Sequence, residues 1–235
     1  MKKIILMLLV ICMTSLVACG NSNQNLENEH EFTAKILEVH ESSILVEPIA
    51  GSNELSSADK ISVNLKNFAE LSLQVGDYVL ITYDGMIAES YPAQILNVFD
   101  IQKVSMSTSN TPTKPNWGLT LNAKNITNTS LTLVCTQSGG SPTGELMTGS
   151  YYVIERYIDG KWCHIEYLEQ EYDIGWTMEA YIIPLNESVG FDIDWGWLYG
   201  SLPAGKYRIG KEFSDFRGTG NYDSVMCYAE FEITK

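Results

Sequence analysis

Apolar and polar residues follow two different patterns along this chain. Residues 4–13 form an unbroken apolar run, whereas later apolar residues mostly occupy alternate positions within short segments. Alternation with a period of two is typical of β-strands that bury one face. The pattern therefore predicts an all-β protein that follows an N-terminal hydrophobic segment.

The first half of the chain contains the segments of a small barrel. Strands are predicted over residues 32–39, 43–47, 59–65, 75–85 and 93–104, with a short helix over residues 66–73. Strands in this number, with a short helix between the third and the fourth, are the layout of an OB-type barrel. We therefore expect an OB-like β-barrel domain over residues 31–104.

The second half is expected to consist of strands and turns. Strands are predicted over residues 119–123, 131–135, 151–157, 161–165, 179–184, 189–195, 205–213 and 226–233. Short strands at this spacing, without helical periodicity, are typical of an antiparallel β-sandwich. Residues 105–116 are rich in Ser, Thr, Asn and Pro. They are expected to be a linker that leads to a sandwich over residues 117–235.

The N-terminus has the composition of an export signal. Two lysines precede the apolar run, and Leu16-Val17-Ala18-Cys19, followed by Gly20, comes shortly after it. The run is shorter than the roughly 20 residues that span a bilayer, which disfavours a membrane helix. The ending resembles the lipobox of bacterial lipoproteins; an ordinary signal peptide is the alternative. The resemblance implies a signal peptide over residues 1–18, cleaved before Cys19, which is acylated on its sulfur atom.

The lipoprotein resemblance also implies a location. Lipid on Cys19 would anchor the protein to the extracellular face of the cell membrane of a Gram-positive bacterium. Residues 19–30 are polar and have no apolar period. They are expected to be a flexible tether that holds the folded part off the membrane.

The charge of the chain limits its partners. The formal net charge is −14, and loss of Lys2 and Lys3 with the signal leaves 13 Lys and Arg against 29 Asp and Glu. Phosphate binding depends on Lys and Arg, so this excess of acid argues against nucleic acid. A solvated acidic surface or a cationic partner both fit the charge.

Three cysteines follow the lipobox, namely Cys135, Cys163 and Cys227. At most one disulfide can form from an odd number of thiols, and a Cys135–Cys227 or a Cys163–Cys227 bridge remains open. Their spacing matches no metal-site motif, which favours small buried hydrophobic residues. No cofactor is expected.

Two stretches carry a resemblance to known domains. The segment GDYVLITYDG at residues 76–85 resembles OB-like domains of small Gram-positive lipoproteins. Four blocks, LTLVCTQSGGSPTGEL, YYVIERYIDGKW, FDIDWGWLYGSLPAGKYRIGKEFSDFRGTGNYD and YAEFEI, resemble a bacterial immunoglobulin-like (Ig-like) domain family of exported proteins. That resemblance implies a β-sandwich and no particular reaction. Cys135 and Cys163 stand where the family usually has plain apolar residues, which also favours buried thiols.

One segment is a candidate binding loop. It contains Asp215, Arg217, Asn221, Tyr222 and Asp223, with Gly-Thr-Gly at residues 218–220 in its middle. The oxygen ligands of Asp215, Asn221 and Asp223 suit a hard cation such as calcium, although no Glu closes the loop. An internal ion pair with Arg217 and a contact with a partner are the alternatives.

No catalytic motif stands out. The three histidines lie outside HExxH, GxSxG and Cys–His settings, and the spacing of the glutamates selects no acid–base pair. The protein is therefore expected not to be an enzyme, but a lipid-anchored binding or scaffolding protein for an envelope protein, a peptide or a wall component. A solute-binding or calcium-binding lipoprotein is the alternative, and an envelope hydrolase a further one.

Overall fold

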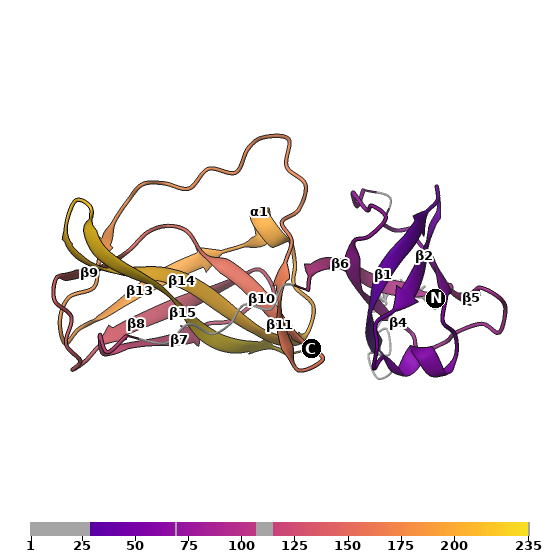
Figure 1. Cartoon of the computed structure of the whole chain (residues 1–235), viewed down its shortest axis with the longest axis horizontal. Helices are drawn as coiled ribbons and strands as arrows, with labels where there is room; N and C mark the ends of the chain where they lie inside the picture. The colour runs from indigo at the N-terminus through magenta and orange to yellow at the C-terminus, as the bar shows by residue number, and fades with distance from the viewer. Residues whose placement is uncertain (1–28, 69, 107–114, 235) are drawn as a thin grey trace, which may run out of the picture.

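The computed structural model describes residues 29–68, 70–106 and 115–234. The expected signal peptide, Cys19 and residues 19–28 of the expected tether lie outside this part of the chain, as does most of the expected linker. The described residues form strands β1–β15, one short α-helix and one 3-10 helix, which confirms the all-β prediction. Figure 1 shows two groups of strands with β6 between them.

The N-terminal group contains the first strands. They are β1 (His30–Val39), β2 (Ser43–Pro48), β3 (Ile61–Asn64), β4 (Tyr78–Tyr83), β5 (Ala93–Ile95) and β6 (Val98–Ser105). β1 pairs with β2 and β4, β2 with β3, β3 in parallel with β5, and β4 with β6. The pairings form the series β5-β3-β2-β1-β4-β6, whose two end strands β5 and β6 follow each other directly along the chain. A core that includes Ile36, Val46 and Ile81 fills the interior of this group.

Two details of this group differ from the sequence predictions. The single strand expected over residues 93–104 is wrong, because Leu96 and Asn97 separate β5 from β6. The chain turns there because β5 pairs with β3 whereas β6 pairs with β4. The helix expected over residues 66–73 is also wrong. Phe68 and Leu71 pack against the core through successive turns, and the 3-10 helix lies earlier, at Asn53–Ser56.

The C-terminal group is a two-layer sandwich. Its smaller sheet has the order β13 (Ser188–Asp194), β8 (Ser130–Gln137), β7 (Leu119–Lys124). The other layer contains β9 (Glu145–Thr148), β10 (Val153–Ile158), β11 (Lys161–Ile165), β12 (Tyr181–Ile182), β14 (Gly205–Gly218) and β15 (Asn221–Ile233). α1 (Gly196–Tyr199) follows β13. The core between the layers contains Trp195, Tyr207 and Phe213, all fully buried, together with Cys135.

Strand β6 joins the two groups. Its last residues, Val104 and Ser105, pair with Ile165 and His164 of β11, so one sheet continues from the barrel-like group into the sandwich. A small apolar cluster that contains Leu80, Val104, Ile158 and Cys163 lies beside this pairing.

A buried arginine completes the junction. Arg156 of β10 donates from Nη2 to Oε1 of Glu31 on β1 at 2.7 Å and to the carbonyl oxygen of Ala204 at 3.1 Å. Its guanidinium carbon lies 5.3 Å from the centre of the Tyr207 ring, and its side chain is only 3% exposed. A charge removed from water in this way stabilises the fold only while its partners remain in place.

We predict that Arg156→Met destabilises the protein by about 2 kcal/mol, because Glu31 and the Ala204 carbonyl lose their donor at the junction. Lys206→Met is the matched control, since the exposed Lys206–Glu230 pair contributes much less. Urea unfolding of both variants measures the difference. Equal destabilisation would contradict a structural role for the junction arginine.

A second buried cation lies inside the sandwich. Lys211 is 3% exposed, donates to the carbonyl oxygens of Gly149 and Tyr151, and lies 5.4 Å from the centre of the Phe191 ring. Burial lowers the pKa of its ammonium group to about 8. The folded state therefore binds this proton less readily than the unfolded state.

We predict that the wild-type protein gains stability relative to Lys211→Met as the pH rises from about 8 to 10.5, the interval between the folded and ordinary pKa values. The gain is at most about 3 kcal/mol, because each pKa unit corresponds to about 1.4 kcal/mol. Urea unfolding of both proteins at the two ends of this interval measures it. A constant difference across the interval would show that Lys211 titrates normally.

Candidate functional site

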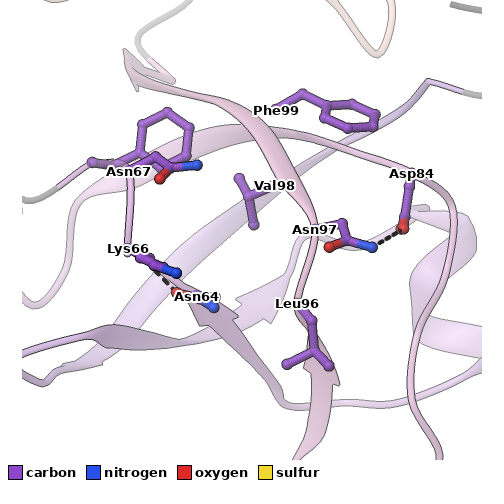
Figure 2. Close-up of a pocket in the computed structure, with 9 residues that line it drawn as sticks. Asn64, Lys66, Asn67, Asp84, Leu96, Asn97, Val98 and Phe99 are labelled. Carbon is purple, nitrogen blue, oxygen red and sulfur yellow. Dashed lines mark hydrogen bonds between the residues drawn. The ribbon is translucent and has the colours of Figure 1, made fainter. Parts of the chain in front are cut away.

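An opening in the N-terminal group lies at its end strands, β5 and β6, which pair with different neighbours. β3 pairs with β5 only as far as Ile95, after which the chain leaves β3 to join β4 as β6. Between the diverging segments lies a cavity of about 610 Å³. Asn64, Lys66 and Asn67 line one side of it, and Leu96 to Phe99 line the other (Figure 2).

A bulge in β6 sets the direction of Phe99. Thr82 pairs with Asp100 and Tyr83 with Val98, so Phe99 is an extra residue without a cross-strand partner on β4. Val98 is buried, whereas the Phe99 side chain is 47% exposed. The bulge therefore presents an aromatic ring at the rim of the cavity instead of burying it.

The lining combines amides with exposed apolar groups. Asn97 donates from Nδ2 to Oδ2 of Asp84 at 2.7 Å, the contact drawn in Figure 2. The side chain of Leu96 is 61% exposed beside it. Such a surface offers hydrogen bonds of either sense and apolar contact, which suits recognition of a polypeptide or another uncharged polar chain.

Two further cavities extend this opening along the chain. One of about 400 Å³ shares Leu96 and Asn97 and adds Met86, which is 72% exposed. The other, of about 380 Å³, shares Phe99 and reaches Pro203 and Ala204 of the sandwich. We call the three together the β5–β6 groove; it follows residues 94–100.

One edge of β6 borders this groove. Among the described residues, β11 pairs with β6 at Val104 and Ser105, and the N–H of Glu166 donates to the carbonyl oxygen of Lys103 at 3.2 Å. Residues 98–102 therefore have β4 as their single neighbouring strand. The backbone N–H of Ile101 donates to the carboxylate of Asp100. Burial raises the pKa of Asp100, although Arg156 and this hydrogen bond act in the opposite direction.

The residues of the predicted binding loop lie together, but in a paired hairpin. β14 extends to Gly218 and β15 begins at Asn221, with Asp215 directly opposite Asp223. The end expected for the strand at residue 213, and the start expected at residue 226, are therefore wrong. β14 continues past Phe216 and β15 begins before Tyr222, and the turn is confined to Thr219 and Gly220.

Arg217 is the centre of this hairpin end. It donates to Oδ2 of Asp223 at 2.8 Å, Oδ1 of Asn221 at 3.1 Å and Oδ2 of Asp215 at 3.3 Å. A guanidinium thus occupies the position where three candidate calcium ligands converge. Tyr222 is 55% exposed, so its side chain is accessible to a partner.

Asp215 is the buried member of the set. Its carboxylate accepts hydrogen bonds from Thr143 N–H at 2.9 Å and Thr143 Oγ1 at 2.7 Å, and from Gly144 N–H. Burial alone would raise the pKa of Asp215, but these donors and the Arg217 charge hold it below its ordinary value. The contacts identify Asp215 as an anchor for the 138–144 segment.

The remaining sequence candidates are buried or lie outside the described part of the chain. Cys135, Cys163 and Cys227 are buried thiols, and burial raises the pKa of Cys163. Within residues 29–68, 70–106 and 115–234, no group of three His, Cys, Asp or Glu side chains is arranged to hold a metal ion. No helix in those ranges is long and apolar enough to cross a membrane. Cys19, the expected lipidation site, precedes them.

Sequence reasoning missed the β5–β6 groove. Its residues belong to a segment that alternates well enough to predict one continuous strand. A signal was present in the sequence. Leu96 and Val98 are apolar, although in one continuous strand they would lie on the face opposite to that of Ile95.

We predict that Asp215→Asn destabilises the protein by about 2 kcal/mol at neutral pH, because an amide cannot accept from all the donors that meet this carboxylate. The loss shrinks as the pH falls below the ordinary value of 3.8, because a carboxyl with a lowered folded-state pKa gives its stability only while ionised. Denaturant unfolding from pH 7 to pH 3 measures it. A difference between the proteins that is independent of pH would rule out this ionised anchor.

Comparison with known proteins agrees with the sandwich. A model of the bacterial Ig-like domain family matches residues 113–232, from before β7 nearly to the end of β15. No curated protein and no solved structure shows a significant match to the chain. The family match covers just over half of the 235 residues and confirms the Ig-like sandwich expected from the sequence. The chain therefore belongs to the family of bacterial Ig-like domain proteins.

Proposed function

We propose that this protein is a non-catalytic binding protein of the cell surface that holds an extended segment of an envelope polypeptide in the β5–β6 groove. The observation that carries the proposal is the position of exposed Leu96 and Phe99 beside the single-neighbour edge of β6. Lipid on Cys19 would keep the protein at the extracellular face of the membrane, and residues 19–30 would connect the folded part to this anchor at a distance from the membrane.

The edge of β6 supports an extended occupant. A peptide that adds itself to a strand edge obtains affinity from backbone hydrogen bonds and specificity from side-chain pockets at alternate positions. The groove offers such an edge over residues 98–102, with cavities on either side of Leu96 and a third beyond Phe99. This arrangement fits a chain of several residues better than a compact solute.

The chemistry of the lining supports binding rather than catalysis. Among the nine residues around the central cavity, Lys66 and Asp84 are the ionisable ones, and the Asp84 carboxylate accepts from Asn97. Acid–base chemistry needs groups with matched pKa values within reach of one substrate atom. Amides and apolar rims suit recognition instead.

The N-terminal group supports the same proposal as a scaffold. We infer that it is an OB-like barrel, because its strands pair in the series β5-β3-β2-β1-β4-β6, in which β3 and β5 are parallel and the rest are antiparallel. OB folds commonly bind chain-like ligands. In this chain, the Ig-like sandwich would fix the orientation of the groove through β6.

We predict that a photo-reactive amino acid at Leu96 crosslinks to a polypeptide on living cells, whereas the same amino acid at Val75 does not. Val75 is a matched control because it is 66% exposed and lies in a turn of the same group of strands. The adduct is cut out and identified by mass spectrometry. A second mutation, Phe99→Asp, is expected to abolish it by placing a charge in the groove.

Two results would contradict the proposal. Equal adducts from Leu96 and Val75 would indicate chance encounters at the cell surface. An adduct at Leu96 that survives Phe99→Asp would show that the groove does not hold the partner.

A further inference from the structure

We propose that the sandwich carries a second, chemically different site, a pocket that receives one Lys or Arg side chain of a polypeptide partner. The pocket has a volume of about 200 Å³, and its lining includes Glu179, Glu212, Tyr151 and Met147. It lies beside β9, at the end of the sandwich away from the N-terminal group (Figure 1). The inference therefore does not rest on the β5–β6 groove.

Two carboxylates meet at this pocket from distant parts of the chain. Glu212 lies on β14, where Thr148 donates from Oγ1 to its carbonyl oxygen at 2.6 Å and so fixes the strand against β9. Glu179 lies just before β12, and its Oε2 accepts from the Tyr181 hydroxyl at 2.5 Å. Both glutamates are exposed. The strand pairing thus presents two negative charges on one cavity.

An aromatic ring, that of Tyr151, also lines the pocket. The Trp176 ring contacts the Tyr151 ring edge-on at 5.2 Å between centres and so supports it from behind. Tyr151 keeps 38% of its surface exposed. Aromatic faces attract ammonium and guanidinium groups, and the methylene stem of either side chain packs on apolar surface.

The charge of the whole chain favours a cationic ligand. The formal net charge is −14. A buried cation, Lys211, donates to the carbonyl oxygens of Gly149 and Tyr151, which lie in two residues of the pocket lining. Backbone carbonyl groups thus hold this ammonium group, while Glu179 and Glu212 stay exposed.

The walls distinguish a basic side chain from a metal ion. Calcium takes six to eight oxygen ligands, whereas this pocket combines two carboxylates with the Tyr151 ring and the Met147 thioether. An organic cation with a long apolar stem uses both kinds of wall. A basic polypeptide is therefore the occupant that fits the lining.

The test compares two double variants of the full chain in lipid nanodiscs. Glu179→Gln with Glu212→Gln removes the pocket charges, and Glu187→Gln with Glu232→Gln removes the same charge at exposed positions outside the pocket. The probe is a fluorescent eight-residue peptide of alternating Leu and Lys, and fluorescence anisotropy gives its Kd. A peptide with acetyl-lysine at each Lys position is the neutral probe.

We expect the pocket variant to bind the peptide about tenfold more weakly, and the control variant to change Kd less than twofold. We expect no binding of the acetylated peptide. Equal weakening in both variants would overturn the proposal in favour of general charge attraction. Undiminished binding by the pocket variant or of the acetylated peptide would overturn it too, as would a rise in Tm with CaCl₂ that the pocket variant alone loses.

Discussion

The pairing of β6 with β4 on one side and with β11 at its end is the constraint on which the rest of this structure depends. It makes one strand belong to both groups, so the sandwich is attached to the barrel-like group by a shared sheet as well as by the chain between them. Just before β6, the chain leaves β3 after Ile95 of β5, and the groove opens where β3 and the chain separate. The junction and the candidate site therefore have one structural cause.

Arg156 shows how this attachment is held. The residue is 125 positions from Glu31, and its guanidinium also contacts the Ala204 carbonyl and the Tyr207 ring. A buried charge is costly unless every partner is in place, which makes the junction specific for one arrangement. The contact between Arg156 and Glu31 thus orients the N-terminal group relative to the Ig-like sandwich.

The sequence predicted the fold class because strand alternation is a local property. Segments such as 131–135 and 161–165 bury alternate side chains wherever their partners come from, and the observed β8 and β11 contain them. The prediction failed where pairing overrides the local pattern. Residues 93–104 alternate as one strand, yet β5 and β6 have different partners, and the 215–223 segment forms a hairpin because β14 and β15 remain paired to its end.

The candidate sites were harder to predict than the fold, because they combine residues from distant segments. Glu179 and Glu212 gain significance only when β9 lies between them, and Leu96 only when β6 turns away from β3. The Arg217 cluster was recognisable from the sequence because its members are close along the chain. Its alternatives could be weighed only after Thr143 and Gly144 were seen to bind Asp215.

Binding along β6 requires an accessible edge of this strand, which amide hydrogen exchange of the full chain measures. Because amides in a strand alternate in direction, Gln102 should be protected by β4, whereas the bulged Phe99 has no cross-strand partner on β4. We predict that the amide of Phe99 exchanges at least about tenfold faster than that of Gln102, with slow exchange at Leu80 of the doubly paired β4. Equal, slow exchange at Phe99 and Gln102 would mean that this edge is already covered, and would contradict binding along it.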